Sequence, residues 1–206
     1  MTFTIAEDIQ LMLAEQPGRL EYQRLLPAAG TLIELALLGR LTSIKKPGFF
    51  VTPLDRLLTV IDGPPTGQPI LDAALEVLSA RKKPWRCDRA LRAIYRQVTA
   101  ATNESLQARG LARPVGEPSD HQGHLEIMDS AGVEARRSVL QRARTLPDTV
   151  TDARLGAVVD VLRNSGNRFR GETGLHERMT RDWYPADATP TVLGIVKAEH
   201  YLCASE

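Results

Sequence analysis

The residues of this chain best suited to bind an anion lie around the start of one predicted helix. Arg89, Arg92 and Arg96 are spaced three and four residues apart, which places them within about 60° of arc on one helix face. Guanidinium groups bind phosphate oxygens through paired hydrogen bonds. Trp85 and Arg86 come just before them; tryptophan favours the headgroup level of a membrane, and a helix N-terminus attracts anions. The pattern predicts a patch that binds anionic lipid headgroups.

A second interpretation explains the same pattern without a ligand. Arginines on a helix face are often solvated and salt-bridged to neighbouring carboxylates, and Trp85 would then belong to the core. The exposure of the helix face that carries Arg89 distinguishes the two interpretations.

No group of residues predicts an enzyme. The histidines do not have metal-ligand spacing with each other or with the cysteines; they are His121, His124, His176 and His200. Cys87 adjoins Arg86, which could lower its pKa, but no histidine lies near it in the sequence, so we interpret it as a spectator thiol. Motifs for phosphate or nucleotide binding are also missing. We therefore expect no catalysis, cofactor or metal.

Length and composition set the broad class. A chain of 206 residues is long enough to bury a substantial core as one domain. Its net charge of +1 gives no global attraction to nucleic acid or membranes, so any such contact needs a local patch. Two cysteines do not make a disulfide framework, and the N-terminus has no basic segment followed by an apolar run. We expect a cytoplasmic protein.

The element that organises the rest is the stretch 26–40, which is apolar almost all round. Such a helix must be buried, and it is too short to cross a bilayer, which needs about 20 apolar residues. Gly39 follows it where a left-handed C-cap glycine belongs. Glu34 is its only charge before Arg40. We interpret Glu34 as an acceptor of structural hydrogen bonds or as a side chain that reaches a loop edge, with a catalytic acid as the alternative.

Amphipathic patterns surround this central helix. Helices are predicted at 5–15, 70–80, 88–109, 133–144 and 152–163, around Leu175–Trp183 and around Val192–Leu202. Short β-rich runs are predicted at 41–45, 49–52 and 57–61, a rigid loop at 62–67, and a hairpin at 112–128. The sequence therefore predicts a mainly α, single-domain helical bundle around a buried central helix, with inserted β-hairpins.

Two motifs resemble the Golgi phosphoprotein 3 family, which includes the yeast vacuolar-sorting adaptor and bacterial relatives. They are GTLIELALLGRL at 30–41 and LLTVIDGPPTGQPILDAAL at 57–75, supported by Gly110-Leu111 and DARLGAVVDVL at 152–162. The resemblance implies a helical bundle and a non-enzymatic peripheral membrane adaptor. Eukaryotic members bind phosphatidylinositol 4-phosphate and hold glycosyltransferases by their cytosolic tails. This chain looks like the short bacterial form.

The family's lipid pocket carries over only in part. It uses a Trp before the core helix, an Arg at that helix's start and two Arg on the later long helix. These positions fall near Arg19 and at Ala28, Arg96 and Thr99. The resemblance therefore implies lipid binding at Arg96, with Arg19, Tyr22 and Arg24 as the nearest substitutes before the core helix. Its partners would be an anionic phospholipid surface and a membrane protein's cytosolic tail.

Two further expectations concern other macromolecules. Family members self-associate through an apolar hairpin tip, whereas the tip 117–123 is polar here, which predicts a monomer or weak dimer. A DNA-binding regulator is the alternative function, because residues 28–52 also resemble a winged helix-turn-helix. Its recognition helix would be apolar, without base-reading side chains, so we expect no nucleic acid.

Overall fold

The computed structural model describes residues 2–14, 25–45, 56–115, 124–128, 130–164 and 183–204. Its described helices are α1 (Ile5–Leu13), α2 (Leu25–Leu37), α3 (Pro69–Ser79), α4 (Cys87–Ala108), α5 (Ala131–Thr145), α6 (Ala153–Asn164) and α7 (Thr189–Ala204). Its described strands are β1 (Leu41–Lys45), β2 (Arg56–Val60), β3 (Trp85–Arg86), β4 (Ala112–Val115) and β5 (His124–Ile127). The structure confirms the mainly α class with small hairpins.

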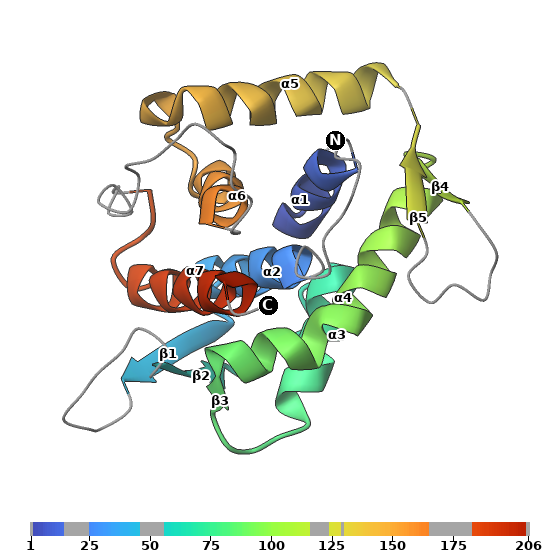
Figure 1. Cartoon of the computed structure of the whole chain (residues 1–206). Helices are drawn as coiled ribbons and strands as arrows, with labels where there is room; N and C mark the ends of the chain where they lie inside the picture. The colour runs from blue at the N-terminus through green and yellow to red at the C-terminus, as the bar shows by residue number, and fades with distance from the viewer. Residues whose placement is uncertain are drawn as a thin grey trace.

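The central helix is α2. Each of its residues from Leu25 to Ala36 is buried, and α1, α4, α6 and α7 pack around it (Figure 1). At Gly30 a side chain would clash, because a Cβ there would lie 2.7 Å from Ile9 and 2.8 Å from Ile5. This missing side chain lets α1 lie directly on α2, so the core sits where the apolar pattern predicted it.

Local sequence signals set the helix ends. Thr4 and Glu7 form the capping box of α1, with both reciprocal hydrogen bonds present. Gly39 and Gly110 have φ values of +67° and +66°, a conformation that glycine adopts without steric cost. The amides that follow them bond back to the helix carbonyls, as in a Schellman C-cap. These ends agree with the predictions to within about two residues.

The small sheet has the order β1-β2-β3 and is antiparallel throughout. β3 was not predicted, because two residues flanked by a basic loop carry no alternating pattern that would indicate a strand. β4 and β5 form the predicted hairpin. The predicted strand 49–52, the helix expected before Trp183 and the hairpin tip lie outside the described residues.

The loop between β2 and α3 is exposed but held by side chains on both sides. Asp72 accepts hydrogen bonds from the backbone N–H and the hydroxyl of Thr66, both at 2.8 Å. Arg40 donates to three loop carbonyls, those of Ile61, Gly63 and Pro64. Side chains on both sides therefore bond to the loop that the sequence predicted to be rigid.

Candidate functional site

The arginine face predicted from the sequence is open in the part of the chain that the structure describes. The inward stripe of α4 is buried and consists of Cys87, Ala90, Leu91, Ile94, Val98, Thr102 and Leu106. Arg89, Arg92 and Arg96 lie on the other side of the helix and are exposed. Because these arginines do not pack into the core, their guanidinium groups lie at the surface, where a ligand could reach them.

The partners of these arginines differ. Arg86 is 48% exposed and donates two hydrogen bonds to Asp88, at 3.0 and 3.2 Å. Arg96 donates to the hydroxyl of Tyr95 at 2.8 Å and lies 5.6 Å from the centre of its ring. Arg89 has no hydrogen bond or ion pair with any described residue. The patch thus contains both anchored and unanchored guanidinium groups.

Trp85 occupies a different position from these arginines. Its ring is half-buried and packs against the main core, and its indole N–H donates to the carbonyl of Leu78 at 2.9 Å. The guanidinium carbon of Arg81 lies 5.0 Å from the ring centre, within range of a cation–π contact. Trp85 therefore joins the basic loop to α3, and its polar atom is already bonded within the protein.

The charge of the chain is concentrated at this place. Residues 81–96 carry seven basic side chains and one acidic side chain, a net charge of +6, whereas the whole chain carries +1. The remainder of the chain is therefore net negative. This segment lies at the lower end of the molecule in Figure 1, where β3 leads into α4. Arg19 and Tyr22, the other candidate lipid-binding residues, lie outside the described residues.

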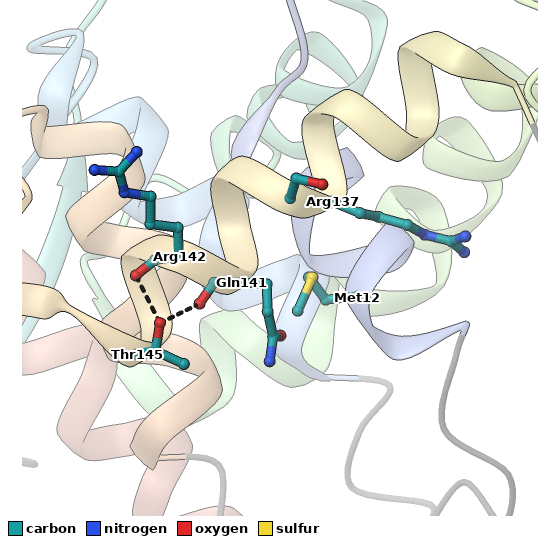
Figure 2. A pocket seen from close by; sticks show the side chains of 6 residues that line it. Met12, Arg137, Gln141, Arg142 and Thr145 are labelled. Carbon is teal, nitrogen blue, oxygen red and sulfur yellow. Dashed lines mark hydrogen bonds between the residues drawn. The ribbon is translucent and has the colours of Figure 1, made fainter.

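A second candidate is a groove of about 460 Å³ between α5 and the end of α1. It is lined by Met12, Arg137, Ser138, Gln141, Arg142 and Thr145. In Figure 2 the side chains of Arg137 and Arg142 point away from each other, and the Thr145 hydroxyl donates to the backbone carbonyls of Gln141 and Arg142. Because its two cations diverge, this groove is a poor site for a single anion.

The sequence analysis missed a buried group of ion pairs, which we name the N-terminal ion-pair cluster. Its carboxylates, Glu7, Asp8 and Glu34, are each 2% exposed. They pair respectively with Arg109 at 2.8 Å, with Arg136, and with Arg154 at 2.6 Å. The only signal in the sequence is its excess of arginine over lysine, 21 to 5, because the paired residues are about 100 or more positions apart along the chain.

Phe3 lies at the centre of this cluster. The guanidinium of Arg109 is 4.2 Å from its ring centre and that of Arg136 is 5.9 Å away, while Arg154 donates to its carbonyl at 2.8 Å. The cluster therefore ties the N-terminal segment to α4, α5 and α6, and its role is structural.

Glu34 is used in the same structural way. One of its oxygens accepts from the backbone N–H of Ile5 at 2.7 Å, and the other pairs with Arg154. Burial raises the pKa of the Glu34 carboxyl, and it also raises the pKa of Asp8, despite the arginine that faces each of them. The predicted structural role of Glu34 is confirmed.

Other chemistry finds little support in the described residues. Cys87 is buried, its thiol donates to the carbonyl of Arg56 at 3.6 Å, and burial raises its pKa to about 12, so it is a spectator thiol. The described residues contain no cluster suited to a metal ion. None of their helices is both long and apolar enough to cross a bilayer.

Comparison with known proteins agrees with the two sequence motifs. Residues 5–183 match the family model described as Golgi phosphoprotein 3 (GPP34). A search of curated protein sequences finds no match. The family match covers α1 to α6 and extends to Trp183.

Proposed function

The chain belongs to the Golgi phosphoprotein 3 (GPP34) family, which consists of non-enzymatic adaptors, and we propose that it docks on anionic membranes through the arginine face of α4. The residues that make this contact are Arg86, Arg89, Arg92 and Arg96. The observation that carries the proposal is the exposure of these side chains within a segment of net charge +6.

Electrostatics gives this docking its strength and its reversibility. Each basic residue close to an anionic surface contributes about 1 kcal/mol. Four arginines, with Arg81, Lys82 and Lys83 also exposed beside them, are enough for reversible attachment. The net negative charge of the remaining chain turns this end of the molecule toward the membrane. Docking orients the rest of the surface toward a protein partner, which for this family is a membrane protein's cytosolic tail.

The ligand chemistry is the phosphate of an anionic lipid headgroup. Of the family's pocket arginines this chain keeps only Arg96, and Arg19 and Tyr22 would be the nearest contacts from the segment before α2. We therefore expect attraction to anionic lipids in general. Phosphoinositides should bind more tightly than other anionic lipids only because they carry more negative charge. We also propose that the protein works as a monomer or weak dimer, because the residues of its hairpin tip are polar.

The DNA-binding alternative depends on α2 as a recognition helix. α2 is buried from Leu25 to Ala36, so it cannot enter a major groove without unfolding the core. The basic segment 81–96 could still attract nucleic acid through its charge alone, and for this reason the decisive experiment includes DNA.

Co-sedimentation with vesicles tests the proposal. The protein should sediment with vesicles of phosphatidylcholine and phosphatidylglycerol, and not with phosphatidylcholine alone. Raising the salt from 0.1 M to 1 M shortens the screening length from about 10 Å to about 3 Å and should release it. The triple variant Arg89→Ala, Arg92→Ala, Arg96→Ala should lose binding.

A matched control removes the same charge elsewhere. Arg113, Arg142 and Lys197 are exposed on β4, α5 and α7, and their triple alanine variant should bind as the wild type does. Equal loss in both triple variants would show that net charge, rather than this face, is responsible. Stronger sedimentation with duplex DNA than with vesicles at both salt concentrations would favour the DNA-binding alternative.

A further inference from the structure

The sheet β1-β2-β3 has two different faces, which its register assigns. Leu58 is fully buried and lies opposite Ser43 and Trp85, so this set points toward the core. Because side chains alternate along a strand, the neighbouring set points away from it. These outward residues are Thr42, Ile44, Leu57, Thr59 and Arg86, and we name them the outer sheet face.

The outer sheet face is apolar on β1 and β2 and basic on β3. Ile44 is 51% exposed and lies directly opposite Leu57, which is half-buried and in turn lies opposite Arg86. Thr42 and Thr59 form the adjacent cross-strand pair. In Figure 1 the sheet lies at the lower edge of the molecule, with α7 and α2 above it. Ile44 lies on the edge strand β1 and outside the core clusters, so its exposed side chain has no role in the core.

Arg86 connects this face to the arginine face of α4. It ends β3 and immediately precedes Cys87, the first residue of α4. A surface that combines aliphatic side chains with cations along its edge suits the boundary between lipid headgroups and acyl chains. The aliphatic side chains add contact that charge alone does not supply, while the cations attract the anionic headgroups.

We propose that the outer sheet face rests in the headgroup boundary of the anionic membrane, with Ile44 as its deepest side chain. This inference builds on the proposed function and adds which surface enters the bilayer. A stable protein interface needs about 20–30 residues on each side, so a face of five residues is too small to hold a protein partner by itself. The face is large enough to add apolar contact to membrane binding that is driven mainly by electrostatic attraction.

A fluorescent label at position 44 tests the contact directly. Ile44→Cys is labelled with an environment-sensitive nitrobenzoxadiazole dye in a Cys203→Ser background, and the buried Cys87 is left in place. Vesicles of phosphatidylcholine and phosphatidylglycerol should shift the emission to shorter wavelength and increase its intensity several-fold, while pure phosphatidylcholine should not. The control is the same label on Val139→Cys in α5, a side chain that is 45% exposed, where no change is expected.

A substitution supplies a second measurement. Ile44→Ser should weaken the partition into anionic vesicles about five-fold, because roughly half of one aliphatic side chain no longer leaves water. Its thermal melting should match that of the wild type, since Ile44 lies outside the core clusters.

The outcomes separate this inference from the proposed function. Sedimentation with vesicles but unchanged emission at position 44 would overturn the inference and leave the proposed function standing. No sedimentation at all would overturn both. An emission shift that grows with protein concentration in the absence of vesicles would show that a second copy covers the face, which also overturns the inference.

Discussion

Arginines at the two ends of α4 have opposite environments. Near its N-terminal end, Arg89, Arg92 and Arg96 are exposed. Beyond its C-terminal end, Arg109 pairs with the buried Glu7 at 2.8 Å and stacks over Phe3. The difference lies in burial, because Arg109 faces a carboxylate that is 2% exposed, whereas the side chains of the other three arginines are exposed. The same residue type is therefore structural where it must neutralise a buried charge, and available for a ligand where it need not.

The largest effect is expected for a new buried charge that has no arginine to pair with. Glu34 is tolerated in α2 because Arg154 and the N–H of Ile5 hold it. Leu35 is next to it and 0% exposed, so Leu35→Asp should unfold the protein, since an unpaired buried charge costs several kcal/mol out of a typical total of about 5–15 kcal/mol. Circular dichroism and thermal melting measure this, and a normal melting transition would contradict the central place of α2.

Removal of an existing partner should cost less. Arg154→Leu leaves Glu34 without its ion pair and should lower the free energy of unfolding by about 3 kcal/mol, the low end for a broken buried pair because Arg154 is 35% exposed. Urea denaturation gives the value. Adding Glu34→Gln removes the unpaired charge and keeps the acceptor for Ile5, so the double variant should recover part of the loss. A double variant less stable than Arg154→Leu would show that the carboxylate is needed for another reason.

The buried pair of Asp8 and Arg136 should differ from the exposed arginines of α4 in that its contribution to stability depends on pH. Burial raises the pKa of Asp8 above its ordinary value of 3.8, so the folded state binds a proton more readily than the unfolded state. The contribution of Asp8 to stability therefore decreases as the pH rises from 3.8 to the raised pKa and is constant above it. Arg136 limits this decrease, because its hydrogen bonds and charge lower the pKa.

Arg136→Leu should accordingly cost more at neutral than at acidic pH. The variant raises the pKa of Asp8 further, and the loss relative to the wild type should be about 3 kcal/mol at pH 8 and smaller at pH 5. Urea denaturation of both proteins at the two pH values measures the difference. In an Asp8→Asn background the effect of Arg136→Leu should no longer depend on pH, and a dependence that persists there would point to another titrating group.

Local signals predicted the fold well, whereas long-range pairing was not visible in the sequence. The apolar run of α2, the capping box at Thr4 and the glycines at 39 and 110 each act within a few residues, so sequence reasoning placed these elements correctly. Glu7 and Arg109 meet only after folding, and nothing at either position distinguishes this pair from a surface ion pair. The same limit applies to β3, whose two residues are a strand only because β2 lies beside them.

The sequence predicted only part of the candidate site, for the same reason. Helical spacing placed Arg89, Arg92 and Arg96 on one face, and burial confirmed that this face points outward. The spacing could not show that the Trp85 indole is bonded to Leu78, or that Ile44 and Arg86 share one face of a sheet. The second fact follows from how β2 pairs with β1 and β3, whereas the first is a contact between residues seven positions apart.

The smallest effect on stability is expected for the exposed arginines. Replacing Arg89, Arg92 and Arg96 with alanine removes only exposed side chains, and like charges three or four residues apart on a helix destabilise it by about 0.2–0.5 kcal/mol per pair. The triple variant should therefore be as stable as the wild type or more stable, by up to about 1 kcal/mol in low salt. Salt screens this repulsion, so any gain in stability should disappear at 1 M sodium chloride.

Urea denaturation at both salt concentrations measures the difference in the free energy of unfolding between the triple variant and the wild type. A loss of more than about 1 kcal/mol would show that these arginines are structural, like Arg109, and would remove the contrast between the two ends of α4.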